Sequence, residues 1–403
     1  VRDDYLMYEY KRMWWPTEFY RNQTLSTIWT DLTNPAMRSA LWQIWFNRDY
    51  TEYAAVTGNT SLTLATWSPS DLLRMYIRKD VAAQIWEYGI TPQPEEPKID
   101  PYASNTISLD PVKVISVAGQ STFSAPRGIA VAPDGSLFVA DSRNHRIVHL
   151  DPTGLYLNSW GSYANVLEGP APEGTFNEPW GVAVAPDGLV YVADTWNHRI
   201  QVFTPEGTFV RMWSEWQVQG VIDSFWGPRG IAVDTQGHVL VTDTGKQRVV
   251  VFDSQGNYLT QFGERGLAEG QLDEPVGIAV DAAGKVYVAD TWNNRVQVFA
   301  PNADFTVYTS VLAWEVDAWT SDSLDNKPFI ALSPDGEVYI TDPDLGRVIR
   351  FDSEGNFLQL WGGYENSYLM GIISGIAIGQ DGTVWVSDAL NNTLLVFEPP
   401  AVP

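Results

Sequence analysis

Short apolar runs alternate with polar turns from residue 112 to residue 398, and the same alternation recurs six times. Residues 191–203 read YVADTWNHRIQVF, and residues 287–299 repeat this pattern as YVADTWNNRVQVF. In each copy an apolar run ends at an aspartate; these anchor residues are Asp141, Asp194, Asp243, Asp290, Asp342 and Asp388. Their spacings are 53, 49, 47, 52 and 46 residues. A period of this length, filled with strand-forming residues, predicts a β-propeller or another repeat array.

Each repeat is predicted to contain four antiparallel strands, which is the content of one propeller blade. An apolar strand such as 181–184 comes first, and a Pro-Asp-Gly turn follows in three repeats, at 133–135, 186–188 and 334–336. Proline followed by glycine favours tight turns. The second strand ends at the anchor aspartate, a loop leads to the third, and another glycine turn leads to the fourth.

The last repeat ends after its third strand, at residues 394–397, whereas residues 112–117 form an isolated strand-like segment before the first repeat. We expect this segment to supply the missing fourth strand of the last blade, which would leave no open sheet edge. The predicted fold is therefore mainly β, a six-bladed propeller closed by an N-terminal strand.

Three sequence patterns recur in these repeats: a P-x-G-I-A-V start, a V-A-D-x-x-N-x-R-I-Q-V-F centre and a G-x-F-x-x-x-W/F-G end. With these patterns the chain resembles the NHL repeat family over about residues 112–398. Lys246 and Leu345 stand at the Asn position, Thr393 stands at the Arg position, and Ile330 stands where Gly is usual. Blades five and six are therefore expected to be the most degenerate.

The chain outside the repeats is predicted to form three further parts. Residues 1–89 are expected to be a small α+β domain, with a helix from Asn34 to about Arg48 and a strand over 71–79. Residues 90–111 contain five prolines and are expected to be a linker or a strap on a surface. Residues 399–403 form a tail.

The segments WPTEFY at 15–20 and LRMYIRKD at 73–80 are similar to the soluble C-terminal portion of polytopic membrane glycosyltransferases of the lipid-phosphosugar mannosyltransferase type. This resemblance implies that catalytic carboxylates lie in membrane loops absent from this chain. It also implies an extracytoplasmic location, periplasmic or at the cell surface, and association with a membrane protein. A start at Val1 without a signal-peptide pattern leaves a mature, a processed and a truncated product as alternatives.

The charge distribution restricts the class of partner. The first hundred residues hold 13 acidic and 10 basic side chains, so the remainder holds 36 and 15, a net charge of −21. Such a surface repels phosphate backbones and anionic membranes, which disfavours nucleic-acid binding. The chain has no cysteine, which excludes disulfides and thiolate metal sites. No run of about 18 apolar residues is present, so no membrane-spanning helix is expected.

The anchor aspartates and the arginines five residues later invite a catalytic interpretation, but repetition favours a structural one. We expect the aspartate to accept backbone N–H bonds in its loop, and the arginine to pair with a carboxylate. Six chemically equivalent sites are not an active site, so no catalytic residue is assigned. The predicted structural pairs are Asp141 with Arg146, Asp194 with Arg199, Asp243 with Arg248, Asp290 with Arg295, and Asp342 with Arg347, while Asp388 has no arginine.

Residues that differ between blades are better candidates for binding. The loops between strands two and three, and those between blades, lie on one side of the disc, and two inter-blade loops are predicted to be long, at 161–177 and 302–326. This side is expected to carry Arg127, Arg143, Trp180, Trp196, Arg229, Trp292 and Phe329. Exposed Trp and Arg are common interface hot spots, and flat aromatic rings also suit sugars. The alternative is that these side chains pack against the loops and against one another instead of binding a partner.

Metal and enzyme signatures are weak. His145 and His198 occupy the same slot in neighbouring blades, and no H-x-H or H-E-x-x-H motif occurs. Resemblance to calcium-dependent lactonases and to a zinc amidating lyase implies unique ligands in the channel, and none is evident. No cofactor is predicted, and calcium is the one considered. The favoured function is a non-catalytic recognition or assembly domain that holds a protein or glycan; the alternatives are a propeller hydrolase or lyase and a structural subunit.

Overall fold

A computed structural model of the chain describes residues 100–119, 121–319, 327–363 and 367–400. The chain divides into two compact units, Val1–Lys98 and Ile99–Pro403, and the described residues belong to the second. The α+β domain predicted for residues 1–89 and the tail from 401 onward lie outside the described residues.

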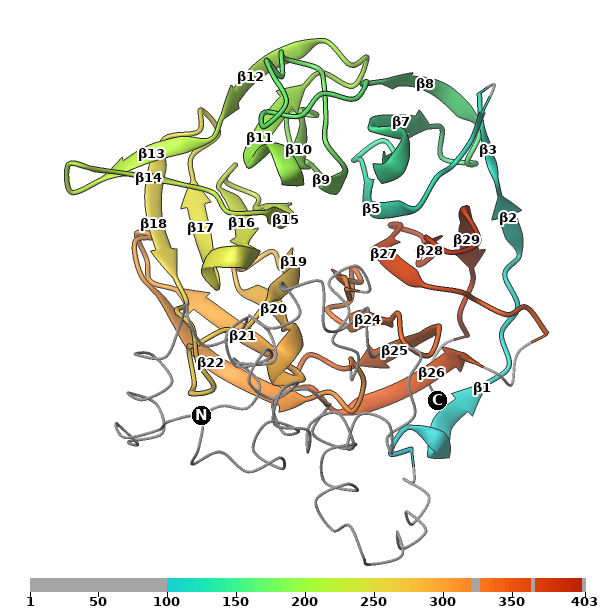
Figure 1. Cartoon of the computed structure of the whole chain (residues 1–403). Coiled ribbons are helices and arrows are strands. Elements are labelled where there is room, and N and C mark those ends of the chain that lie inside the picture. Colours follow the sequence, from blue (N-terminus) through green and yellow to red (C-terminus); the bar gives the residue numbers. More distant parts are fainter. Residues whose placement is uncertain (1–99, 120, 320–326, 364–366, 401–403) are drawn as a thin grey trace, which may run out of the picture. The chain divides into compact units, whose positions relative to one another are not determined.

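Six sheets, five with four strands and one with five, are arranged in a ring around a central axis (Figure 1). Blade one comprises β5 (Pro126–Val131), β6 (Leu137–Asp141), β7 (Arg146–Leu150) and β8 (Tyr156–Trp160). Blade two comprises β9 (Pro179–Val184), β10 (Val190–Asp194), β11 (Arg199–Phe203) and β12 (Phe209–Trp213). Blade three comprises β15 (Pro228–Val233), β16 (Val239–Asp243), β17 (Arg248–Phe252) and β18 (Tyr258–Phe262). The first strand of each blade lines the axis.

The second half of the ring follows the same order. Blade four comprises β19 (Pro275–Val280), β20 (Val286–Asp290), β21 (Arg295–Pro301) and β22 (Tyr308–Glu315). Blade five comprises β23 (Ile330–Leu332), β24 (Val338–Asp342), β25 (Arg347–Phe351) and β26 (Phe357–Gly362). Blade six comprises β27 (Ile373–Ile378), β28 (Val384–Asp388), β29 (Thr393–Phe397) and β2 (Lys113–Ile115). The six-bladed fold predicted from the repeats is therefore confirmed.

The ring is closed by a strand from the beginning of the propeller. Strand β2 pairs antiparallel with β29, with Lys113 opposite Val396 and Ile115 opposite Leu394, so the predicted closure is confirmed. The preceding segment adds β1 (Thr106–Ile107) parallel to β26, after the short 3-10 helix η2 (Ala103–Asn105). Tyr102 is buried in the core between blades four and five. The described end of the proline-rich segment thus packs on the propeller.

The second and third strands of the blades are largely buried on both faces, because each sheet lies between two neighbours, whereas fourth strands such as β12 are partly exposed. Every residue of β10 is fully buried. One core cluster combines Tyr191 and Ile200 of blade two with Val241 and Phe252 of blade three. Removing each such side chain from water contributes about 1.5–3 kcal/mol. Near-continuous apolar runs, rather than strict alternation, are the expected sequence of such strands.

Two hairpins are inserted into this scheme. Strands β13 (Glu215–Val218) and β14 (Val221–Ser224) form a hairpin between blades two and three, which projects beyond the rim of the disc (Figure 1). Strands β3 (Val117–Ala118) and β4 (Ser121–Thr122) form a smaller one before blade one. The expected inter-blade loop at 302–326 is wrong in its first part, because residues 308–315 are the fourth strand of blade four.

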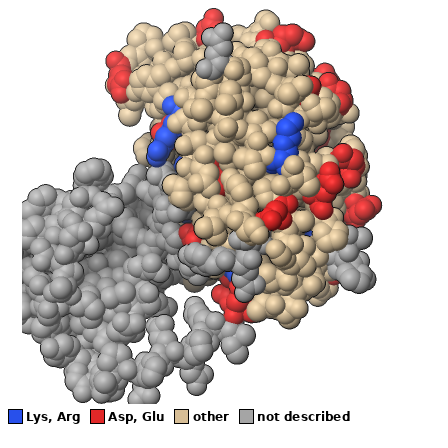
Figure 2. All heavy atoms as spheres, turned by 90° about the vertical axis from the view of Figure 1, so that its right-hand side faces the viewer, with Lys and Arg blue, Asp and Glu red and all other residues tan. Residues whose placement is uncertain are grey.

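The two sides of the disc differ in their connections. We call the side with the strand two–three loops and the inter-blade connections the loop face, and the opposite side the turn face. Aspartates cap turns on the turn face: Asp134, Asp151, Asp253, Asp352 and Asp381 each accept the backbone N–H of the residue two positions later. Hydrogen bonds from Ser136 lower the pKa of Asp134. Among the charged residues visible in Figure 2, Asp and Glu outnumber Lys and Arg.

No helix among residues 100–400, as far as they are described, is long and apolar enough to span a bilayer.

Candidate functional site

The loop face is built around a repeated turn after each anchor aspartate. In blades one to four the chain forms a 3-10 turn there: η3 (Ser142–Asn144), η4 (Thr195–Asn197), η5 (Thr244–Lys246) and η6 (Thr291–Asn293). The next residue has a left-handed backbone, for example His198 at φ 53°. This reversal sends the chain back into the third strand.

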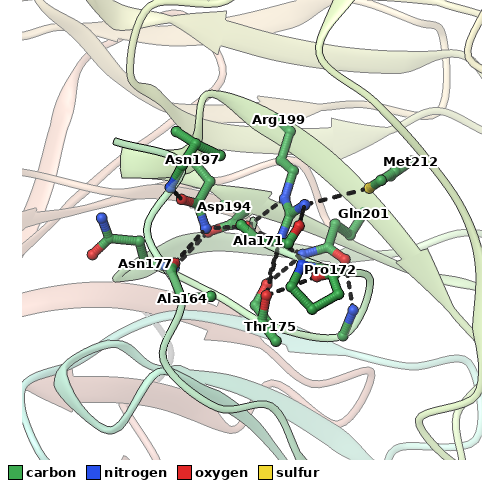
Figure 3. A network of polar contacts seen from close by, with 12 residues as sticks. Ala164, Ala171, Pro172, Thr175, Asn177, Asp194, Asn197, Arg199, Gln201 and Met212 are labelled. Carbon is green, nitrogen blue, oxygen red and sulfur yellow. Dashed lines mark hydrogen bonds and ion pairs between the residues drawn. The ribbon is translucent and has the colours of Figure 1, made fainter. Parts of the chain in front are cut away.

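Asp194 in blade two shows what the anchor carboxylate does (Figure 3). Its Oδ1 accepts the backbone N–H of Asn177 at 2.7 Å, and its Oδ2 accepts Arg199 Nε at 2.7 Å. Gln201 Nε2 donates to the same Oδ2 at 3.1 Å. The Arg199 guanidinium also donates to the carbonyl oxygens of Ala171 and Thr175, at 2.6 and 2.7 Å. The network therefore fixes the inter-blade loop onto blade two.

The same ion pair occurs in four other blades. Its oxygen-to-nitrogen distances are 2.7 Å for Asp141–Arg146, 2.9 Å for Asp243–Arg248, 2.7 Å for Asp290–Arg295 and 2.8 Å for Asp342–Arg347. Blade six has Thr393 in place of the arginine, and Asp388 instead accepts Gly371 N at 2.8 Å and Asn391 Nδ2 at 2.7 Å. Burial raises the pKa of the Asp194 carboxyl, while Arg199 opposes that shift. These contacts are those of a structural pair.

A second repeated contact joins neighbouring blades at four of the six junctions in the described part of the chain. The left-handed residue after the 3-10 turn accepts the backbone N–H of the residue before the proline that opens the next blade. His145 Nδ1 accepts from Glu178 at 3.1 Å, and His198 Nδ1 accepts from Gly227 at 3.0 Å. Burial lowers the pKa of both histidines. His145 and His198, which hold the same position in neighbouring blades, are thus inter-blade hydrogen-bond acceptors. This role requires an unprotonated Nδ1.

The seven predicted binding residues separate into two groups. Arg127, Trp180, Arg229 and Phe329 are at most 8% exposed, so the expectation that they stand exposed before the first strand is wrong. The reason is that the first three lie within strand one, where six strands converge on the axis. Trp292 is half-buried, and Arg143 and Trp196 are exposed. Of the seven, Arg143 and Trp196 are the ones exposed enough to contact a partner directly.

The buried residues form a compact group at the axis, which we call the central cluster: Arg127, Trp180, Arg229, Glu274 and Lys327. The Cζ atoms of Arg127 and Arg229 lie 3.7 and 4.4 Å from the centre of the Trp180 ring. Glu274 Oε2 lies 3.2 Å from Arg229 Nη1 and 4.0 Å from Lys327 Nζ. Lys327 Nζ also lies 4.8 Å from the Trp292 ring centre. Cation–π contacts with ion pairing stabilise this desolvated charge.

Sequence reasoning missed Glu274 and Lys327. Both directly precede the proline that opens a blade, at Pro275 and Pro328. The residue at this position differs in charge between blades, and this difference could have marked both residues as candidates from the sequence.

An apolar surface lies beside the cluster on the loop face; we define the apolar patch as Val166, Leu167, Trp196 and Trp226. Their exposed fractions are 42%, 84%, 37% and 49%. Val166 N donates to Asn197 Oδ1 at 3.0 Å, which places the loop from blade one against η4. The Trp226 ring stacks on His198, with centroids 5.0 Å apart and planes at 9°. These contacts place Trp226 and the loop that carries Val166 against the turn of blade two that contains Trp196.

Trp226 was also missed by sequence reasoning. It follows the β13–β14 hairpin. Its backbone N–H donates to the anchor aspartate of blade three, with Trp226 N 2.6 Å from Asp243 Oδ1. A Cβ at Gly245 would lie 1.8 Å from Trp226 Cδ1. Glycine at this position of blade three, where blades two and four have Trp, lets the Trp226 ring lie across the loop.

The turn-face end of the channel contains a cavity of about 270 Å³. Its lining is largely apolar and includes Val131, Val184, Val233 and Ile378. The carboxylate of Asp234, also in the lining, is bound by His238 Nδ1 at 2.7 Å. Within the described ranges no three or more His, Asp or Glu side chains gather in a metal-binding group.

Comparisons with known proteins support the repeat assignment. Residues 123–150, 176–203, 225–252 and 272–299 match the NHL repeat. NHL repeat-containing protein 2 of Homo sapiens is 44% identical over 78 residues, 18% of this chain and 11% of the relative. Peptidylglycine alpha-amidating monooxygenase of Rattus norvegicus is 32% identical over 125 residues, 29% of this chain and 12% of the relative. The chain spans about a tenth of the length of these relatives.

A solved gluconolactonase of Xanthomonas campestris superposes with a TM-score of 0.52 at 16% identity, covering 71% of this chain and 88% of that protein. This similarity reflects the fold alone. The resemblance of residues 1–90 to glycosyltransferases gains no support from these comparisons. The four matched segments span the first three strands of the first four blades, and with the six-bladed architecture they show that this chain carries an NHL-repeat β-propeller.

Proposed function

We propose that the propeller is a non-catalytic recognition module that binds a protein partner through the apolar patch on its loop face. The observation that supports this proposal is the pair Trp196 and Trp226, whose side chains are 37% and 49% exposed on adjacent blades. Tryptophan is among the residues that contribute most to binding energy when an interface covers it.

Both rings are held in place before a partner arrives. Trp226 stacks on His198, and its backbone is fixed by Asp243. Trp196 Nε1 donates to Glu178 Oε2 at 3.4 Å. Side chains that are already ordered lose less conformational entropy on binding, and this increases affinity for a given contact area.

The surroundings of the two rings favour a protein over a glycan. Leu167 is 84% exposed within the patch, and the hairpin that leads to Trp226 carries Val221 and Ile222 at 68% and 64% exposure. Aliphatic side chains with few polar groups match the apolar centre of a protein interface. A sugar would require more hydrogen-bonding groups beside the rings.

No specific observation favours a propeller hydrolase or lyase. Five anchor aspartates are paired with an arginine, and the sixth, Asp388, accepts hydrogen bonds from its own loop. An extracytoplasmic location and association with a membrane protein remain proposals that rest on residues 1–90.

The test compares partner capture by three forms of the full chain. These are the wild type, the Trp196→Ala plus Trp226→Ala variant, and a control with Tyr156→Ala plus Leu157→Ala on β8, whose side chains are 40% and 52% exposed. We expect a protein retained by the wild type and the control, with affinity for the purified partner about 100-fold weaker in the tryptophan variant.

Equal affinity of the three forms would rule out the patch. Each form is first checked for an unchanged melting temperature. A glycan array probed with the wild type covers the alternative: specific binding to a sugar, lost in the tryptophan variant and without a protein partner, would replace the protein proposal.

A further inference from the structure

We infer that the central cluster is a binding site for a carboxylate group, with Arg229 as its principal ligand-binding residue. This inference concerns the carboxylate group itself, whichever molecule carries it, and its test does not depend on the protein partner proposed above. It rests on the burial and the incomplete hydrogen bonding of donors at the axis.

Arg229 is a buried cation with sparse pairing. The residue is 4% exposed, its Nη1 lies 3.2 Å from Glu274 Oε2, and its Nε has no hydrogen-bond partner. The same Glu274 oxygen lies 4.0 Å from Lys327 Nζ. One carboxylate therefore contacts two buried cations. A buried guanidinium that keeps an unsatisfied N–H is costly, since water no longer solvates it.

Another buried arginine shows the usual arrangement. Arg350 is 7% exposed. Its Nε and Nη2 lie 2.7 and 2.6 Å from Glu337 Oε2, and its Nη1 donates to the Pro400 carbonyl at 3.1 Å. All three nitrogens of Arg350 are thus engaged. The difference shows that Arg229 is a buried arginine of the central cluster with hydrogen-bonding capacity left for a ligand.

Trp180 supplies a second unused donor beside Arg229. Its residue is fully buried, and its Nε1 has no hydrogen-bond partner. The Arg229 Cζ atom lies 4.4 Å from the centre of the Trp180 ring, so the two donors belong to one small region. An acceptor with two oxygens satisfies both, and a carboxylate matches the fork of a guanidinium.

The cluster reaches solvent at Trp196. The Trp196 ring, 37% exposed, has its centre 6.0 Å from Arg229 Cζ. A ligand enters from this side along the indole ring. The chain carries a net charge of −24, and its field repels a phosphate dianion more strongly than a carboxylate monoanion. The geometry therefore points to a carboxylate.

Two kinds of molecule carry such a carboxylate, a protein with an acidic side chain and an acidic sugar. N-acetylglutamate represents the first source and glucuronate the second. Tighter binding of N-acetylglutamate assigns the site to a protein carboxylate, and tighter binding of glucuronate assigns it to an acidic sugar.

The experiment titrates acetate, N-acetylglutamate and glucuronate into the full chain at constant ionic strength. Arginine Nε–Hε resonances of the ¹⁵N-labelled protein report binding, and Arg229→Lys assigns the Arg229 signal. We expect a saturable shift of this signal in the wild type. Isothermal titration calorimetry measures the affinity of every form, because Arg229→Lys lacks the Arg229 resonance. Affinity should fall about tenfold in Arg229→Lys, which keeps the charge but loses the fork. Arg350→Lys, the matched buried control, should bind like the wild type.

An Arg229 signal that does not shift saturably in the wild type would overturn the inference. Equal affinities of Arg229→Lys and the wild type would also overturn it. Trp226→Ala separates this site from the partner surface, because it should weaken partner binding and leave acetate binding unchanged.

Discussion

His198 in blade two accepts a hydrogen bond from the backbone N–H of Gly227 in blade three, with 3.0 Å between the two nitrogens. Gln247 accepts from Glu274 in the same way at 2.5 Å. Asn392 accepts from Ala125 at 2.8 Å, across the junction where the ring closes. A neutral side-chain acceptor at the residue that precedes the third strand therefore joins neighbouring blades at several junctions.

Because burial lowers the pKa of His198 below its usual 6.5, the unfolded chain binds a proton more readily than the folded one. The contribution of His198 to stability is complete above pH 6.5 and is lost as the pH falls towards the lower folded pKa. We predict that His198→Asn, which cannot titrate, flattens the pH dependence of the unfolding free energy between pH 7.5 and 5 by about 1 kcal/mol. Urea denaturation at several pH values measures this difference.

His198→Leu is the control, since it removes the acceptor at every pH. It should be less stable than His198→Asn at pH 7.5 and should show a similarly flat profile. An unchanged pH slope in both variants would mean that His198 does not titrate in this range.

The Asp194–Arg199 pair tests whether the repeated ion pair holds the blades. Asp194→Ala leaves Arg199 buried without its carboxylate, and removing one partner of a buried pair costs about 3–5 kcal/mol. Asp388→Ala is the matched variant, because blade six has Thr393 instead of an arginine. It loses hydrogen bonds only, so we expect a loss of about 1–3 kcal/mol. Chemical denaturation of both variants compares them, and equal losses would contradict the ion-pair interpretation.

The repeated features were predictable from sequence because every blade meets the same neighbours. The anchor aspartate recurs since each 3-10 turn needs an acceptor, and residues 112–117 could be placed since the last repeat lacked a strand. Non-repeated features were less accessible. Arg127 and Trp180 are buried because they point to the axis, which their position along the chain does not reveal. Trp226 follows the β13–β14 hairpin, and Ser124 holds the equivalent position after the β3–β4 hairpin. No second tryptophan therefore marked this position.

Asp273 carries a carboxylate whose burial raises its pKa to about 6. Its Oδ1 has no hydrogen-bond partner. A raised carboxyl pKa means that the group's stability contribution is complete below about 3.8 and is lost as the pH rises through 6. We predict that Asp273→Asn stabilises the protein by about 1 kcal/mol at pH 7.5 and changes little at pH 4. Thermal unfolding at the two pH values measures this.

Asp223 is the control of opposite sign. Hydrogen bonds from Arg248 and Lys246 lower the pKa of its carboxyl, so its contribution is present above about 3.8 and is lost as the pH falls. Asp223→Asn should therefore destabilise the protein at pH 7.5. Destabilisation by Asp273→Asn at pH 7.5 would mean that the charged carboxylate is needed by neighbouring cations.

The tryptophan that ends a repeat packs on the glycine turn of the next blade. A Cβ at Gly256 would lie 2.8 Å from Trp213 Cε3, whereas a Cβ at Gly336 would meet nothing within 4 Å. Both glycines have φ near +86°, at +86° and +87°, so alanine at either costs about 1–2 kcal/mol of backbone strain. Overpacking against Trp213 adds about 1–3 kcal/mol at Gly256 only.

We therefore predict that Gly256→Ala destabilises the propeller more than Gly336→Ala, by the overpacking energy alone. Differential scanning calorimetry of the two variants at pH 7.5 isolates that energy, because the backbone strain is common to both. The same contact recurs between Trp160 and Gly207, so Gly207→Ala should resemble Gly256→Ala. Equal melting temperatures for Gly256→Ala and Gly336→Ala would mean that Trp213 moves aside at little cost, and the tryptophan–glycine contact would then not determine how adjacent blades are spaced.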